Sequence, residues 1–215
     1  MEIAEARIAV QTLGNHRKLG QKDRRNMGKL RIVAVSLLIL WMVSRSGRFL
    51  VIDEPQKSDT ILVLAGETDR RPSRALDLLA QGYARRIVLD VPATVTAYGT
   101  TYVDLARKWV SSLPQASLIT VCPIYGLSTK AETIEADTCV RKEGGNSVLI
   151  LTSDFHTRRA LSIFRHEIKV RPFSIAAARD PEQFGELWWR HRQWAKTNAD
   201  EWLRLLWWEM VDRWL

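Results

Sequence analysis

The sequence predicts an α/β fold of the Rossmann-like type, a parallel sheet with helices on both faces, preceded by an N-terminal membrane-anchor helix. Three observations predict it. Short apolar runs alternate with helical patterns from residue 59 onward, which is typical of βαβ units. Polar clusters follow these runs where parallel strands would end. A continuous apolar segment near the N-terminus comes before all of them.

Residues 1–31 form a basic segment, which we expect to lie in the cytoplasm. They hold eight Lys or Arg and three Asp or Glu, so most of the +8 formal charge of the chain lies here. No basic helix with interleaved aromatic residues follows, so the charge indicates membrane topology and not nucleic-acid binding. Met27 precedes a short basic stretch and the apolar run, and we expect it to be the native start.

Residues 32–52 are predicted to form a signal anchor. Ile32–Val43 is continuously apolar, and residues 47–52 continue its character. A small-x-small cleavage motif is missing, which favours an anchor over a cleaved signal. A buried core helix is the alternative, because the run is short for a membrane span. The positive-inside rule then predicts a single-pass protein of the bacterial inner membrane, with its domain facing the periplasm or the outside.

The α/β domain is expected to span residues 53–182. Continuously apolar or β-branched runs predict buried strands, and apolar positions at helical spacing predict the helices between them. Glycines at 82 and at 144–145 mark two helix ends. In chain order the predicted elements are strand 60–64, helix 72–83, strand 86–91, helix 101–113, strand 117–122, helix 129–142, strand 148–152, helix 157–165 and strand 169–175.

The tail, residues 183–215, is predicted to be helical and to pack on the domain. It contains seven of the nine tryptophans. The alternative is that some of these rings lie at the membrane interface, where amphipathic aromatic side chains are favoured.

Two polar clusters follow the first and third strands. In the first, Gly66 would let the backbone approach a ligand, and Arg70 or Arg74 would hold a phosphate or carboxylate. A charged helix start is the alternative reading. In the second, Ser128 and Thr129 are candidate anion ligands and Glu132 is a candidate catalytic group. Here the alternative is a capping box at the start of a helix.

The third cluster, after the strand 148–152, is the most informative. A strand that ends in polar residues and turns straight into a helix suits an anion, which Ser153 and Arg159 would bind. His156 is a candidate general acid or base, oriented by Asp154 or Glu132. We expect no metal, since the chain lacks a His/Cys pair at ligand spacing.

Cys122 and Cys139 form no CxxC motif. They can form a disulfide in an oxidising compartment or remain two buried thiols, and both alternatives stay open.

Taken together, these segments resemble the YdcF/SanA/ElyC family of bacterial envelope-associated proteins. The matching pieces are ILVLAGE at 61–67, QGYA at 81–84, Ser128-Thr129 with Glu132, LTSDFHTRRA at 151–160 and DEWL at 200–203. Family members commonly have Ser-Gly after the second strand, where this chain has Asp90-Val91. The resemblance implies a Rossmann-like domain on a membrane anchor, with a role in envelope integrity or lipid-carrier handling. It names no cofactor and no established reaction.

Two classes of function follow. The first is an enzyme or binding protein that acts on an anionic small molecule or lipid carrier, a phosphate-bearing envelope precursor. The second is a non-enzymatic scaffold that docks envelope-biogenesis proteins through its tryptophan-rich tail. A cytoplasmic protein that binds an adenosyl cofactor is a third and weaker alternative, because it conflicts with the expected anchor.

Overall fold

The computed structural model describes residues 29–66, 69–126 and 128–215. Most of the expected basic segment and the expected start at Met27 lie outside these residues. The chain divides into two compact units, Met1–Arg45 and Ser46–Leu215. In the first, residues 29–44 are helical and their large apolar side chains are exposed. None of the helices within the described residues is long and apolar enough to span a bilayer.

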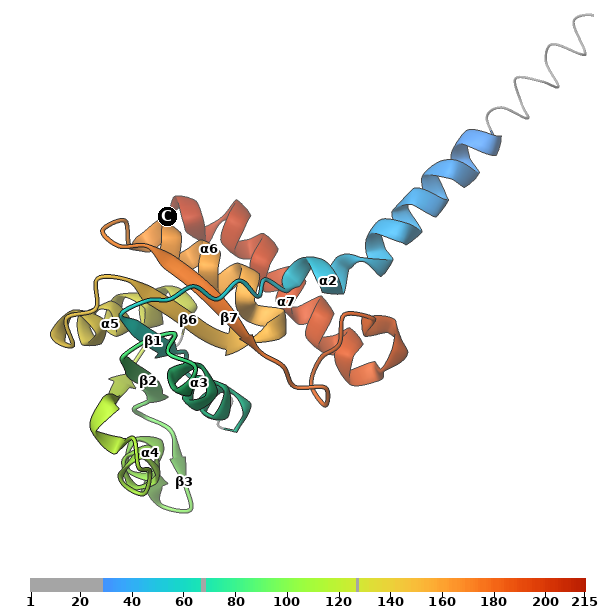
Figure 1. The fold of residues 1–215 in the computed structure, drawn as a ribbon. Helices are drawn as coiled ribbons and strands as arrows, with labels where there is room; N and C mark the ends of the chain where they lie inside the picture. Colours follow the sequence, from blue (N-terminus) through green and yellow to red (C-terminus); the bar gives the residue numbers. More distant parts are fainter. Residues whose placement is uncertain (1–28, 67–68, 127) are drawn as a thin grey trace, which may run out of the picture. The chain divides into compact units, whose positions relative to one another are not determined.

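The second unit is built on a parallel sheet with the strand order β5-β2-β1-β6-β7 (Figure 1). Every neighbouring pair in this sheet is parallel. The strands are β1 (Thr60–Val63), β2 (Arg86–Pro92), β5 (Ile119–Ile124), β6 (Val148–Ser153) and β7 (Phe173–Ala178). The chain builds outward from β1 in one direction and then from β6 in the other. This order confirms the predicted Rossmann-like class and puts a topological switch point between β1 and β6.

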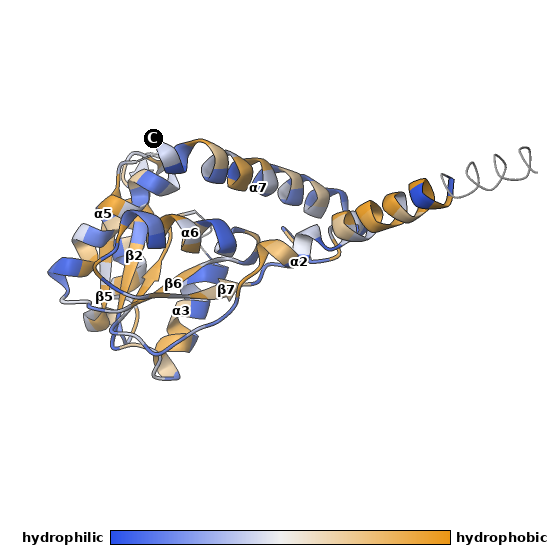
Figure 2. Ribbon diagram, turned by 90° about the horizontal axis from the view of Figure 1, so that it is seen from above, coloured by the Kyte–Doolittle hydropathy of each residue, from blue (hydrophilic) through white to orange (hydrophobic). Residues whose placement is uncertain are grey.

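Helices cover both faces of the sheet, and alternate strand residues point to each. Ile61 of β1 packs in the core with α3 (Arg70–Ala80) and α4 (Tyr102–Ser111). Leu62, the next residue, packs in the opposite core with α5 (Thr129–Lys142) and α6 (Thr157–Glu167). Burial on both faces explains why these strands are continuously apolar and not alternating. In Figure 2, β2 and β6 are accordingly coloured as hydrophobic.

Several predicted elements have different bounds in the structure, and one hairpin was not predicted. The last strand begins at Phe173 and not at residue 169, because Pro172 precedes it and cannot donate a ladder hydrogen bond. Pro123, expected to end a strand, instead lies inside β5, which is tolerated because β5 is at the edge of the sheet. An unpredicted hairpin joins β3 (Thr96–Ala97) to β4 (Thr100–Thr101).

The tail is an integral part of the second unit. Leu50 of α2 (Ser46–Leu50) forms a small core with Phe184 and Leu205, the last of which lies on α7 (Arg192–Met210). The end of the expected anchor segment, from residue 46, therefore belongs to the α/β unit.

The tail tryptophans divide between the two alternatives. Trp208 is buried and donates to Ser162 Oγ at 3.0 Å, and Trp202 donates to the Ser46 carbonyl at 3.2 Å. Trp207 and Trp214 are exposed. Packing therefore accounts for the buried rings, while the exposed rings remain available for an interface.

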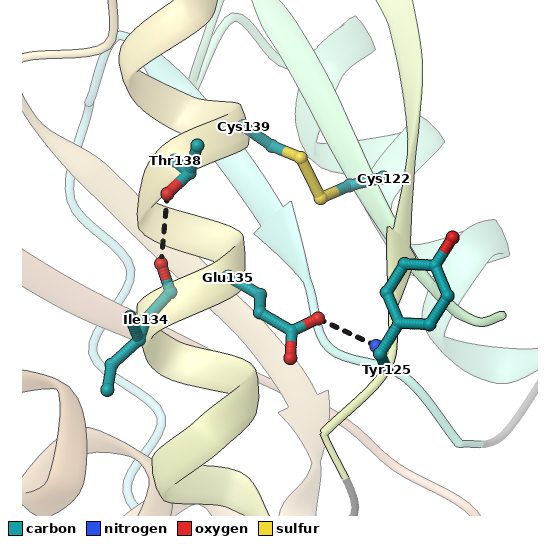
Figure 3. Close-up of a disulfide and its surroundings, with 6 residues drawn as sticks. All are labelled: Cys122, Tyr125, Ile134, Glu135, Thr138 and Cys139. Carbon is teal, nitrogen blue, oxygen red and sulfur yellow. Dashed lines mark hydrogen bonds between the residues drawn. A yellow bond between two sulfur atoms is a disulfide. The ribbon is translucent and has the colours of Figure 1, made fainter.

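A disulfide joins Cys122 of β5 to Cys139 of α5, with a Cα–Cα distance of 6.2 Å (Figure 3). This resolves the open question about the two cysteines. One turn earlier on α5, the Glu135 carboxylate accepts hydrogen bonds from the backbone N–H of Tyr125 (2.6 Å) and Gly126 (2.9 Å). The disulfide and Glu135 together fix β5 and the residues after it to the middle and second half of α5.

Candidate functional site

A cluster of buried polar side chains lies at the carboxyl ends of β1 and β6, where open α/β sheets bind ligands. Four α-helices contribute to it, α3, α5, α6 and α7, together with the short 3-10 helix Asp154–His156 that follows β6. We call the cluster the switch-point site. Its side chains are Arg71, Thr129, Glu132, Ser153, His156, Arg159 and Glu201.

Arg71 links the ends of β1 and β6. Its Nη1 donates to the carbonyls of Leu64 (2.9 Å) and Ala65 (2.5 Å), and its Nε and Nη2 donate to Ser153 Oγ at 3.1 and 3.0 Å. Gly66 lies against the guanidinium, with a φ of +135°, and a Cβ there would be 3.0 Å from Nη1. Only glycine fits both the backbone conformation and this close approach.

Glu132 reaches from α5 to the end of β1. Its Oε1 accepts a hydrogen bond from Ala65 N at 2.7 Å. The cap of α5 is Ser128, whose Oγ accepts from Ala131 N at 3.2 Å. The capping alternative therefore holds for Ser128 but not for Glu132. Burial raises the pKa of Glu132 to about 7, against the opposing effect of the Ala65 N–H, Arg71 and Arg159. The carboxyl can thus exchange a proton near neutral pH.

His156 and Arg159 share one carboxylate, Glu201 of α7. His156 Nδ1 lies 3.1 Å from Glu201 Oε1, and Arg159 binds both oxygens, Nε to Oε1 at 2.7 Å and Nη2 to Oε2 at 2.9 Å. Arg159 Nη1 also donates to Thr129 Oγ1 at 3.1 Å. Sequence reasoning expected Asp154 or Glu132 to orient His156; the structure gives this role to Glu201.

The pKa values of His156 and Glu201 depend on their burial and on the charged groups that they contact. Burial lowers the pKa of His156, although the hydrogen bond and charge of Glu201 act in the opposite direction. Burial alone would raise the pKa of Glu201, but His156 and Arg159 outweigh it and lower that pKa. A neutral imidazole held through Nδ1 by an ionised carboxylate can act as a general base through Nε2.

The structure separates four of the expected site residues from this cluster: Ser128, which caps α5, and Arg70, Arg74 and Asp154. Arg70 and Arg74 line a groove between α3 and the end of β7, with Asp77 and Arg179. Asp154 accepts a hydrogen bond from its neighbour Phe155 N at 2.9 Å. Burial raises the pKa of Asp154 to about 7, and the charges of Arg179 and Asp180 also act on it. The expected residues that come together are Gly66, Thr129, Glu132, Ser153, His156 and Arg159.

Sequence reasoning did not identify Arg71 or Glu201 as site residues. The helical spacing of each with buried apolar residues would have indicated them. Arg71 is buried on the same face of α3 as Ala75 and Leu78, whereas Arg70 and Arg74 lie on another face. Glu201 lies on the buried face of α7 with Leu205 and Trp208. A charged residue on an apolar helix face has to be paired, and is therefore a site candidate.

We expect Glu132→Gln to flatten the pH dependence of stability. The folded pKa of Glu132 is about 7 against an ordinary 4.5, so its stabilising contribution is complete below 4.5 and is lost as pH rises through 7. Glutamine stays neutral and still accepts from Ala65 N. The free energy of unfolding at pH 8 should therefore rise by about 2 kcal/mol relative to the parent protein, with little change at pH 4.5.

Chemical denaturation at a series of pH values measures this effect. The matched control is the exposed Glu182, whose Gln variant should keep the slope of the parent protein. An unchanged slope in Glu132→Gln would contradict a neutral Glu132 in the folded state.

Comparisons with known proteins identify no family: no protein-family model, curated protein or solved structure matches this chain. Across residues 29–66, 69–126 and 128–215, no group of three or more His, Cys, Asp or Glu side chains is placed to hold a metal ion. The functional argument therefore depends on the geometry of the switch-point site.

Proposed function

We propose that the protein is a membrane-anchored envelope protein of the YdcF/SanA/ElyC type. At the switch-point site it binds or processes a phosphate-bearing cell-envelope precursor or lipid carrier. The observation that carries the proposal is the buried pair of His156 and Glu201 with the partly buried Arg159, beside Arg71 at the carboxyl edge of the sheet. Guanidinium groups suit a phosphate, and a positioned imidazole suits proton transfer to or from it.

Each side chain has a separate role in this proposal. Arg71 and Arg159 provide positive charge for the anion. His156 transfers a proton through Nε2, because Nδ1 is occupied by Glu201. Glu132 is a second proton carrier, since burial raises its pKa to about 7. Two titratable groups with pKa values moved in opposite directions are a frequent arrangement for acid and base chemistry.

Two further observations support the location. The Cys122–Cys139 disulfide is typical of an oxidising compartment such as the periplasm. The helical residues 29–44 expose Leu37, Leu40 and Trp41. Insertion of this apolar surface into a bilayer would remove it from water.

The proposal predicts distinct effects for His156→Ala and Arg159→Ala. The full chain in detergent micelles is titrated with a polyprenyl phosphate and a polyprenyl pyrophosphate, with binding and phosphate release measured together. Loss of the proton carrier should lower turnover at least a hundredfold with affinity within about threefold. Loss of Arg159 should weaken binding at least tenfold.

Arg204→Ala is the matched control, because Arg204 is an exposed arginine that pairs with Asp200 on the surface. It should change neither binding nor turnover. Binding and turnover that are the same in all three variants as in the parent protein would overturn the proposed site.

A non-enzymatic scaffold is the second candidate, and the outer face of α7 favours it. Four large apolar side chains are exposed there at helical spacing: Leu203, Leu206, Trp207 and Met210. Deletion of residues 183–215 is not a clean test, because it also removes Glu201 and the buried Trp208. Cross-linking in membranes with Leu203→Ser/Trp207→Ser, compared with His156→Ala, tests it instead. Loss of cross-linked envelope proteins only in the α7 variant would favour the scaffold.

A further inference from the structure

An apolar cavity of about 330 Å³ lies beside the switch-point site. Its floor is formed by the ends of β1 and β2, one wall by α4, and Ala97 of the β3–β4 hairpin also lines it. The α4 side chains that line it are Tyr102, Leu105, Ala106 and Trp109. Leu105 and Trp109 are large apolar residues that are 43% and 36% exposed. A ligand in the cavity would cover part of this apolar surface.

The cavity and the polar site meet at Gly66 and Pro72. Gly66 lines the cavity, and a Cβ at this residue would be 3.0 Å from Arg71 Nη1. Pro72 lines the cavity and directly follows Arg71 in α3. Leu64 also lies in both the cavity and the switch-point site, because it lines the cavity and its carbonyl accepts a hydrogen bond from Arg71 at 2.9 Å. One ligand can therefore reach the guanidinium with its anionic end and the cavity with an adjoining apolar part.

The lining favours a hydrocarbon over a polar ring. Its residues are mostly aliphatic, with Leu89, Val91 and Pro92 on the strand side. Among the described residues, Asp90 and Tyr102 are the ionisable residues in the lining, and both carboxyl oxygens of Asp90 are buried away from solvent. A nucleobase in this cavity would lose hydrogen bonds to water that a mostly aliphatic lining replaces only in part, whereas a hydrocarbon would lose none.

We infer that this cavity binds the first part of a branched hydrocarbon chain whose phosphate lies at Arg71 and Arg159. The ligand class is thus a prenyl phosphate, and the cavity selects it against free phosphate and against nucleotides. The inference rests on the proposed function, since it uses the same anion site. It adds that the apolar part of the ligand enters between α4 and the β3–β4 hairpin.

The test measures affinity for geranyl phosphate and for inorganic phosphate by calorimetry, with the full chain in detergent micelles. Ala106→Phe fills the cavity from α4. Arg107→Phe is the matched control, because it adds the same ring at the neighbouring position, which does not line the cavity. Ala97→Phe fills the cavity from the β3–β4 hairpin. It replaces Ala106→Phe in the test if Ala106→Phe has a lower Tm than the parent protein.

We expect the parent protein to bind geranyl phosphate at least tenfold more tightly than inorganic phosphate. Either cavity-filling variant should weaken geranyl phosphate binding at least tenfold, with no change for inorganic phosphate. Arg107→Phe should change neither affinity. Equal affinity of the parent protein for both probes, or full geranyl phosphate affinity in the filled variants, would overturn the inference.

Failure of the proposed function would look different. In that case Arg159→Ala would bind both probes as tightly as the parent protein does, while the filled variants would still lose geranyl phosphate. The cavity would then be a prenyl site without the proposed anion partner.

Discussion

Replacement of Glu201 by alanine is expected to lower the free energy of unfolding by about 3–5 kcal/mol. The reason is that the substitution would leave Arg159 without its charged partner. Arg159 is bound to both Glu201 oxygens, at 2.7 and 2.9 Å, and its Nη1 donates to Thr129 Oγ1 at 3.1 Å. Without the carboxylate, a guanidinium charge stays in a buried position with one neutral acceptor. Chemical denaturation of the purified chain measures the loss.

The matched control is the adjacent residue, Asp200. It forms an ion pair with Arg204 at 2.9 Å, but the two side chains are 62% and 60% exposed. Exposed pairs of this kind contribute little, so Asp200→Ala should stay within about 0.5 kcal/mol of the parent protein. Arg159→Met/Glu201→Leu removes both buried charges together and should recover most of the stability. Equal stability losses in the Asp200 and Glu201 variants would contradict a buried ion pair.

A second substitution at the same residue, Glu201→Gln, has a readout that a purely structural role would not produce. The hydrogen bond and the charge of Glu201 both raise the pKa of His156, against the lowering effect of burial. Glu201→Gln should therefore lower the pKa of His156 further, as followed by NMR titration of its ring protons. The exposed His191 serves as an internal reference in the same spectra. A His156 titration that does not move would mean that Glu201 does not tune the imidazole.

Local sequence pattern was sufficient for most of the fold and for all the side chains of the switch-point site except Arg71 and Glu201. The strands are buried on both faces, so they are continuously apolar and easy to recognise. His156 and Arg159 follow β6 immediately, so the strand-to-helix turn alone located them. Glu201 comes more than forty residues later in the chain, and its contact with His156 depends on how α7 packs on α6. A local sequence pattern does not predict a contact between residues so far apart in the chain.

The choice among neighbouring arginines shows a different limit. Arg70, Arg71 and Arg74 all lie at the start of α3, and each can bind an anion. Their direction depends on the rotation of the helix about its axis, which Ala75 and Leu78 set by packing on the sheet. Since 100° separates successive helical residues, a neighbouring position is enough to move a guanidinium out of the site.

The Cys122→Ala/Cys139→Ala double variant is the second substitution with a large expected effect. The bridge closes a loop with a sequence separation of 17. Its removal releases that loop in the unfolded chain and should lower the free energy of unfolding by about 3 kcal/mol. For a chain of this size the loss corresponds to a fall in Tm of about 6–12 °C. Calorimetry of the two proteins side by side measures it.

Reductant provides the control, because it breaks the same bond without a substitution. It should lower the Tm of the parent protein by a similar amount and leave the double variant unchanged. If reductant has no effect on the parent protein, its cysteines were never bridged. The disulfide would then cease to support a periplasmic domain.

If the bridge forms in cells, chains trapped in the cytoplasm should contain reduced cysteines and unfold at the lower Tm of the variant. A thiol-labelling assay on chains with and without residues 1–45 makes that comparison, because the α/β unit begins at Ser46. Labelling of Cys139 only in the truncated chain would link residues 1–45 to formation of the disulfide.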